Sequence, residues 1–206
     1  MQETAFIWDL DGTLLDSYEA ILSGIEETYA QFSIPFDKEK VRAFILKYSV
    51  QDLLMQVAEE RGLDVDKLNQ VRAQSLAEKN AQVILMPGAR EVLAWANQKG
   101  IQQFVYTHKG DNALTILRDL GLDVYFTEIL TSQSGFARKP NPEAASYLIS
   151  KYHLKPERTY YIGDRLLDIE FALNSAIKSL NFLSCNKEGN QQIRALEDII
   201  TLLSNQ

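Results

Sequence analysis

Six residues that could take part in chemistry stand where predicted strands end, or shortly after those ends. They are Asp9, Asp11, Thr107, Lys139, Asp164 and Asp168. Taken singly, each has a structural explanation, because aspartate favours turns and an acid can also complement a helix N-terminus. Taken together, four carboxylates at one edge of a sheet would repel one another unless a cation joined them. The set therefore favours a functional site that holds a cation beside one lysine and one hydroxyl.

Short apolar or alternating segments are the elements that must position these residues. Five of them predict strands, over 5–8, 101–107, 126–131, 159–162 and 177–182. Helices are predicted between and after the strands, over 89–99, 111–120, from 141 onward, 166–175 and 190–203. Alternating strands and helices indicate an α/β fold, a parallel sheet with helices on both faces. Ligands bind beyond the carboxyl ends of the strands in such a sheet, which is where the six residues stand.

The section between the first two predicted strands has a different pattern. From about residue 17 to residue 83 the apolar residues follow helical spacing, and no comparable strand is predicted. We therefore expect an all-helical domain over 16–83, inserted after the first strand. The α/β domain would then be formed by 1–15 and 84–206.

Composition limits the possible partners and the location. The 206 residues include 21 Lys plus Arg and 28 Asp plus Glu, a net charge of −7. This balance argues against nucleic acid or an anionic membrane as the main partner. The single cysteine, Cys185, cannot form an internal disulfide. Neither a secretory signal nor an apolar run of roughly 18 residues is recognisable, so we expect a soluble cytoplasmic protein and, by default, a monomer.

Four short motifs stand at the predicted strand ends in a fixed order along the chain. They are Asp9-Leu10-Asp11-Gly12-Thr13-Leu14, Phe104-Val105-Tyr106-Thr107, Lys139-Pro140-Asn141-Pro142, and Gly163-Asp164 with Asp168. Together they resemble the motifs of the haloacid dehalogenase superfamily of phosphotransferases. The helical insert after the first motif resembles the cap of the branch that contains phosphoglycolate phosphatases and β-phosphoglucomutases. The resemblance covers the whole chain and implies a Rossmann-like core with a helical cap domain.

The resemblance also implies phosphoryl transfer and a role for each acid of the first motif. Asp9 would be the nucleophile that forms an aspartyl-phosphate. Asp11 would be the general acid–base that protonates the leaving alkoxide and later activates water. Mg²⁺ would be held by the Asp9 carboxylate, the Asp11 backbone carbonyl and Asp164, an all-oxygen set of ligands that this ion prefers.

The remaining members of the set are implied to bind phosphate or to support the site. Thr107 and Lys139 would contact phosphate oxygens, and the lysine would also neutralise Asp9. His108 either meets the phosphate as well or only occupies the loop. Asp168 would hold Lys139 or a metal-bound water. Arg165 either touches substrate or is an exposed residue at a helix start.

Substrate choice is expected to rest with the cap, since the core handles only the phosphate. Lys47, Tyr48 and Ser49 are the candidates for contacting the organic part of the substrate. A solvated helix end is an equally good explanation of these three residues.

The predicted function is hydrolysis of a small phosphorylated metabolite, of the phosphoglycolate or sugar phosphate type. Asp11 argues against dehalogenation, because dehalogenase relatives lack a second acid at this position. A phosphomutase is the alternative, although Ile21 stands where β-phosphoglucomutases carry a cap histidine, and Gln51 where their phosphate-binding arginine aligns. A receiver protein that accepts phosphate without turnover is a further alternative, but receivers are shorter and carry no helical cap.

Overall fold

The computed structural model describes residues 3–77, 79, 83–185 and 187–204. The chain forms two compact units, and we describe each by itself. The α/β unit consists of Met1–Asp16 and Leu85–Gln206, and the helical unit is Ser17–Ile84. A short pair of strands, β2 (Leu15–Asp16) and β3 (Ile84–Leu85), joins the two chain segments at which the α/β unit is interrupted.

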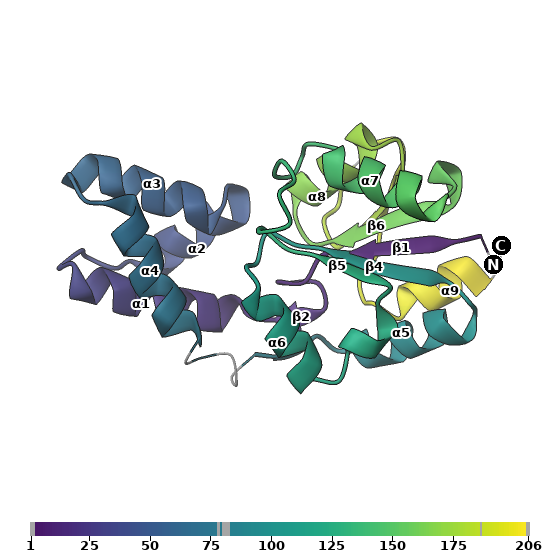
Figure 1. Cartoon of the computed structure of the whole chain (residues 1–206), viewed down its shortest axis with the longest axis horizontal. Coiled ribbons are helices and arrows are strands. Elements are labelled where there is room, and N and C mark those ends of the chain that lie inside the picture. The colour runs from purple at the N-terminus through teal and green to yellow at the C-terminus, as the bar shows by residue number, and fades with distance from the viewer. Residues whose placement is uncertain (1–2, 78, 80–82, 186, 205–206) are drawn as a thin grey trace. The chain divides into compact units, whose positions relative to one another are not determined.

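The α/β unit is built on a six-stranded sheet with the strand order β5-β4-β1-β6-β7-β8 (Figure 1). All of its strand pairs are parallel. The strands are β1 (Ala5–Trp8), β4 (Gln102–Tyr106), β5 (Glu128–Leu130), β6 (Thr159–Gly163), β7 (Lys178–Asn181) and β8 (Asn190–Gln192). In β1, between β4 and β6, all four residues are buried, which explains why this strand reads as a continuous apolar run.

Helices cover both faces of this sheet, as the alternation of elements predicts (Figure 1). They are α5 (Ala89–Gln98), α6 (Asn112–Asp119), α7 (Glu143–Tyr152), α8 (Leu166–Asn174) and α9 (Asp198–Ser204), with short 3₁₀ turns η2 (Asp123–Tyr125) and η3 (Pro156–Arg158). Small residues of α7 and the Phe171 ring of α8 pack on one face, against Ile7 and Phe104 of the sheet. On the other face, the buried Gln103 amide accepts a hydrogen bond from the Trp8 indole and donates one to the Leu93 carbonyl of α5. The prediction of a Rossmann-like α/β fold is confirmed.

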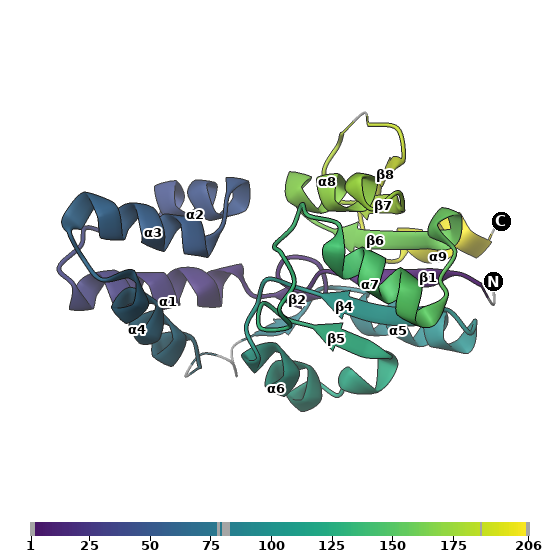
Figure 2. The same ribbon diagram turned by 45° about the horizontal axis from the view of Figure 1, so that its top comes forward.

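The segment 190–203 corrects one of the predicted elements. The sequence predicts one closing helix there, but Asn190–Gln192 forms the edge strand β8 beside β7 (Figure 2). Ile193 continues the pairing, since its N–H donates to the Asn181 carbonyl at 2.9 Å. The helix α9 begins only at Asp198, whose carboxylate accepts from two preceding backbone N–H groups. Pairing with an open sheet edge therefore prevails over the local helical pattern.

The helical unit contains α1 (Tyr18–Gln31), α2 (Lys38–Lys47), α3 (Val50–Arg61) and α4 (Val65–Ala77). Apolar residues at helical spacing form its own core, among them Leu22, Ile25, Leu54 and Leu68. Gly62 ends α3 in the left-handed conformation, with φ +65°. Within the described part of the chain, no helix is long and apolar enough to cross a membrane.

Gly24 offers a test of the packing between α1 and α4. A Cβ added at Gly24 would meet only atoms of Leu76, at 3.8 Å, which is an ordinary van der Waals distance. We expect Gly24→Ala to raise the free energy of unfolding by about 0.5–1 kcal/mol, because glycine inside a helix costs about that much backbone entropy. Urea denaturation followed by circular dichroism measures the change. A loss of stability would show that α1 and α4 lie too close together for an added methyl group to fit at Gly24.

Candidate functional site

The candidate site lies where three neighbouring strands of the α/β unit end. Asp9 follows β1, Thr107 follows β4, and Asp164 follows β6. The Asp9 N–H donates to the Ile162 carbonyl at 2.9 Å, which fixes the end of β1 against β6. Because β1 lies between β4 and β6, residues more than 150 positions apart in the sequence come to one edge of the sheet.

Lys139 is the central side chain of this site. It belongs to the loop before α7, and its ammonium group is completely buried. Its Nζ donates to Asp9 Oδ1 at 2.8 Å, to Asp168 Oδ1 at 2.7 Å and to the Tyr161 hydroxyl at 2.8 Å. The Tyr161 hydroxyl in turn donates to the Tyr106 carbonyl at 2.8 Å. The lysine charge is thus paired with two carboxylates and held in one position.

Asp168 is occupied on both of its oxygens. Oδ1 accepts from Lys139, while Oδ2 accepts from the backbone N–H groups of Arg165 at 3.0 Å and Asp164 at 3.3 Å. Its side chain fills the space beside Gly163, where an added Cβ would lie 2.5 Å from the Asp168 Cβ. Asp168 therefore caps the start of α8 and anchors Lys139, so both of its oxygens already accept hydrogen bonds.

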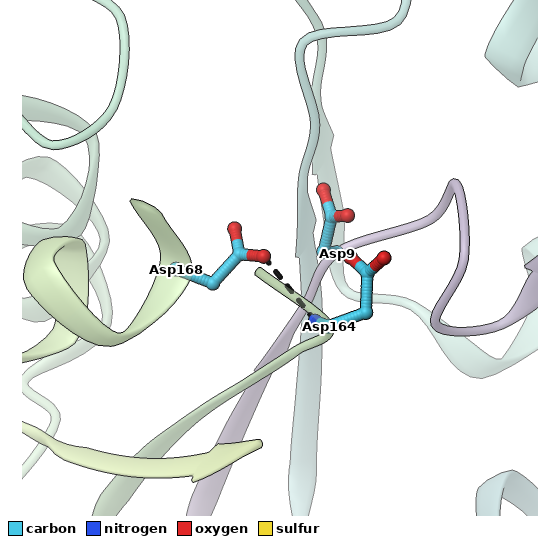
Figure 3. Close-up of side chains that lie close together, drawn as sticks. All are labelled: Asp9, Asp164 and Asp168. Carbon is cyan, nitrogen blue, oxygen red and sulfur yellow. Dashed lines mark hydrogen bonds between the residues drawn. The ribbon is translucent and has the colours of Figure 1, made fainter. Parts of the chain in front are cut away.

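Three acids of the site could provide ligands for a metal ion. One carboxylate oxygen each from Asp9, Asp164 and Asp168 lie within 4.8 Å of one another (Figure 3). Since Asp168 is already bound on both oxygens, Asp9 and Asp164 are the pair suited to a cation. Hard carboxylate oxygens are the ligands that suit a divalent cation such as Mg²⁺, so the residues present fit the expected ion.

The charges of the cluster are unequal because burial and pairing act differently on each group. Burial raises the pKa of Asp9 to about 6, against the opposing effect of Lys139. Burial acts in the same direction on Asp168, but there Lys139 and Arg165 outweigh it and hold the pKa of that carboxyl below its usual value. The pKa of Lys139 is raised, because Asp168 and Asp9 outweigh the effect of its burial. The buried ion pair is therefore Lys139 with Asp168, and Asp9 is the carboxyl that titrates nearer neutral pH.

His108, expected beside the phosphate, instead contacts the backbone of Lys139. Its Nε2 accepts a hydrogen bond from the Lys139 N–H at 2.9 Å. Its Nδ1 is buried and has no hydrogen-bond partner among the described residues. Burial, together with the charges of Lys139 and Arg138, lowers the pKa of His108, so the imidazole is neutral. Since Nε2 is an acceptor, Nδ1 carries the proton.

Two residues of the site were not singled out by the sequence reasoning. Lys109 donates from Nζ to Asp11 Oδ1 at 2.9 Å, and its side chain is only 3% exposed. Its backbone N–H donates to the hydroxyl oxygen of the buried Thr107. Tyr161 holds Lys139, as described above. The strand-end rule could have indicated Lys109, two positions after Thr107, whereas nothing in the sequence distinguishes Tyr161 from other apolar residues of β6.

Lys47, Tyr48 and Ser49, the candidates for substrate contact, lie in the helical unit, where one is buried and two are exposed. Ser49 is buried and caps α3, since its hydroxyl accepts from the Asp52 N–H at 3.1 Å and donates to the Asp52 carboxylate at 2.6 Å. Lys47 and Tyr48 are exposed, with the ammonium 4.9 Å from the centre of the ring. Their contribution to substrate choice stays a prediction, and Ser49 has a structural role of its own.

Comparisons with known proteins identify the family of the chain. Residues 6–182 match the family model of haloacid dehalogenase-like hydrolases. Phosphoglycolate phosphatase 1 of Pseudomonas aeruginosa is 25% identical over 180 residues, which is 84% of this chain and 66% of that protein. The chain spans just under two thirds of the length of such Pseudomonas relatives.

Other relatives match over their full length. Pyrophosphatase PpaX of Oceanobacillus iheyensis is 24% identical over 216 residues, covering 100% of this chain and 99% of that protein. Among solved structures, the core domain of a candidate phosphoglycolate phosphatase from Streptococcus pneumoniae is 44% identical, with a TM-score of 0.61. That match covers 100% of this chain and 98% of the other chain.

The raised pKa of Asp9 predicts how the stability of the protein depends on pH. Ionising Asp9 is easier in the unfolded chain, with an ordinary pKa of 3.8, than in the fold, with a pKa of about 6. The wild-type protein should therefore lose stability as the pH rises from about 4 to about 6, relative to Asp9→Asn. Without divalent cations at pH 7.5 we expect Asp9→Asn to be more stable by about 1–3 kcal/mol, and the difference to vanish near pH 4.

Urea denaturation across this pH range measures the difference between the two proteins. Asp198→Asn is a control whose stability should change in the opposite direction. Hydrogen bonds from the Arg194 and Ala195 N–H groups lower the pKa of Asp198, whereas the pKa of Asp9 is raised. That variant should be less stable than the wild type at neutral pH and equal to it in acid. A wild type as stable as Asp9→Asn at pH 7.5 would contradict the assignment for Asp9.

Proposed function

Because the chain belongs to the haloacid dehalogenase-like hydrolase family, we propose that it is a Mg²⁺-dependent phosphatase of a small phosphorylated metabolite. The observation that carries the proposal is the buried Asp9 carboxylate, held by Lys139 at 2.8 Å beside the Asp164 carboxylate. A nucleophilic carboxylate needs such a surrounding, because it must approach a phosphate that is also negatively charged. At about 4 Å and an effective dielectric near 20, each like-charge pair costs about 4 kcal/mol.

The reaction runs in two halves on Asp9. In the first, an Asp9 oxygen bonds to phosphorus, the bond to the leaving oxygen breaks, and Asp11 gives its proton to that oxygen. In the second, Asp11 takes a proton from water while the water oxygen bonds to phosphorus, and the Asp9–phosphorus bond breaks. The product is inorganic phosphate, and both aspartates return to their starting states.

The other residues of the site bind phosphate and balance charge. Asp9, the Asp11 backbone carbonyl and Asp164 would hold Mg²⁺, which when bound supplies positive charge against the phosphate. Lys139 compensates Asp9 and the phosphate from within the fold, and Asp168 with Tyr161 keeps it in place. The hydroxyl of Thr107, next to the end of β4, donates to a phosphate oxygen.

The substrate that we propose is of the phosphoglycolate or sugar phosphate type. Support comes from relatives named as phosphoglycolate phosphatases, and a relative named as a pyrophosphatase adds a further phosphorylated compound to test. The helical unit would act as the cap that selects the organic part, with Lys47 and Tyr48 as exposed candidates. A phosphomutase must hold a second phosphate, and Ile21, at the position of the mutase histidine, is a buried apolar residue. Hydrolysis is therefore favoured over phosphoryl transfer to sugar.

A panel of phosphorylated compounds tests the activity. The purified protein should release inorganic phosphate from p-nitrophenyl phosphate and from at least one of phosphoglycolate, a sugar phosphate or pyrophosphate. Asp9→Asn should lower kcat by about 10³-fold or more, because it removes the nucleophile. Asp198→Asn, an acid at the start of α9 on the surface, is the matched control and should keep the wild-type rate. Phosphate release that survives in Asp9→Asn would exclude this mechanism.

The metal requirement has its own test. EDTA should abolish the activity, and Mg²⁺ should restore it and raise the melting temperature of the wild type, because the ion binds the folded protein. Asp164→Asn should keep the fold but need at least about 10-fold more Mg²⁺ for half-maximal activity, since it removes one carboxylate ligand. Turnover that is insensitive to EDTA would count against the proposed site.

A further inference from the structure

Lys109 forms a second buried ion pair in the α/β unit, separate from that of Lys139. Its Nζ lies 2.9 Å from Asp11 Oδ1, and the two side chains are 3% and 22% exposed. An ammonium group this deeply buried needs acceptor oxygens, and Asp11 Oδ1 can accept its hydrogen bond whether the other oxygen carries a proton or not. The pair links the loop after β4 to the loop after β1, across 98 positions of sequence.

The backbones on both sides of this pair are held in place. The Lys109 N–H donates to Thr107 Oγ1 at 3.1 Å, and its carbonyl accepts from the Ser132 N–H at 2.9 Å. On the other side, Gly12 turns the chain with φ +82°, and its N–H donates to the Leu15 carbonyl at 2.8 Å. The ion pair therefore joins two fixed loops, and it restricts the one part of Asp11 that backbone bonds do not hold, its side-chain torsions.

We infer that Lys109 is a positioning residue for Asp11, one that fixes the carboxylate in the orientation in which it exchanges a proton with the leaving group. The inference rests on the proposed function, since it needs Asp11 to act as the acid–base. A proton donor must be within hydrogen-bond reach of its acceptor in a defined geometry, and a carboxyl that turns freely spends little time there.

This role differs in a measurable way from direct binding of phosphate by Lys109. Protonation matters for a poor leaving group such as an alkoxide, and hardly at all for p-nitrophenolate, which leaves as a stable anion. Loss of a positioning residue should therefore slow the first half-reaction, the transfer of phosphate to Asp9, for alkyl phosphates alone. Hydrolysis of the phosphorylated Asp9 is the same for every substrate and cannot separate the two roles. Loss of a phosphate ligand would instead raise KM and weaken inhibition by inorganic phosphate with every substrate.

The experiment compares Lys109→Met with the wild type, using p-nitrophenyl phosphate and the best alkyl phosphate of the panel. The methionine keeps most of the side-chain volume and removes the charge. In a single turnover that follows the first half-reaction, we expect the rate with the alkyl phosphate to fall by about 10- to 100-fold, part of the 10²- to 10⁴-fold that general acid catalysis supplies. The first half-reaction with p-nitrophenyl phosphate and the inhibition constant of inorganic phosphate should change by less than about threefold.

A double-mutant cycle with Asp11→Asn shows whether the lysine acts through Asp11. In the Asp11→Asn background, Lys109→Met should have no further effect on the alkyl phosphate, because no proton donor is left to position. Lys155→Met is the matched control, since Lys155 pairs with Glu3 on the exposed surface. If Lys109→Met does not fold, as judged by circular dichroism, Lys109→Arg replaces it in the cycle and should show a smaller loss confined to the alkyl phosphate.

The outcomes separate this inference from the proposed function. Equal losses on both substrates in the first half-reaction, weaker inhibition by inorganic phosphate, or a full additional loss in the Asp11→Asn background would overturn the positioning role while leaving the phosphatase intact. A wild-type protein that releases no phosphate from any compound would overturn the proposed function, and the inference with it.

Discussion

The buried ammonium group of Lys139 is the interaction on which the rest of the site depends. Its three partners come from three elements, since Asp9 follows β1, Tyr161 belongs to β6, and Asp168 belongs to α8. Two acids and a lysine can share a completely buried space only when the charges compensate and every hydrogen-bonding position is used. One side chain therefore fixes the relative positions of two strand ends and a helix.

Several neighbouring residues hold the Lys139 ammonium group in place or make room for its partners. Gly163 has no side chain because a Cβ would occupy the space of Asp168. Asp168 Oδ2 accepts hydrogen bonds from backbone N–H groups, and this fixes the carboxylate so that Oδ1 is directed to the lysine. The neutral imidazole of His108 accepts the Lys139 N–H and holds the backbone from which the lysine side chain extends. Each of these groups acts on the site through Lys139.

The two acids of the first motif are paired with different lysines, and this suits the different tasks that we propose for them. Lys139 lies entirely inside the fold with Asp9, whereas the Asp11 that Lys109 binds is partly exposed. A nucleophile benefits from a fixed surrounding without water, while a group that exchanges protons with an alcohol and with water must be reached by both. The net charge of −7 does not prevent binding of an anion, because solvent screens distant charges within about 8–10 Å and local cations dominate.

The sequence by itself determined the architecture of the α/β unit and which motif residues meet. Its apolar runs and turns are local signals, and parallel strands necessarily end at the same edge of the sheet. Asp9, Thr107 and Asp164 could therefore be placed together from the sequence. Local signals were insufficient where an edge strand competed with a helix, and the strand at 190–192 formed because β7 offered unpaired backbone groups.

Only the tertiary structure decided the partners of the buried charged and polar groups. The pairs Lys109–Asp11 and Lys139–Asp9 span 98 and 130 positions, and nothing in a local pattern states which lysine reaches which acid. The same is true of two hydrogen bonds of Lys139. Its N–H donates to His108, and its ammonium group donates to the Tyr161 hydroxyl. Such partners depend on the direction and reach of side chains across a finished sheet, and this geometry exists only once the strands have paired.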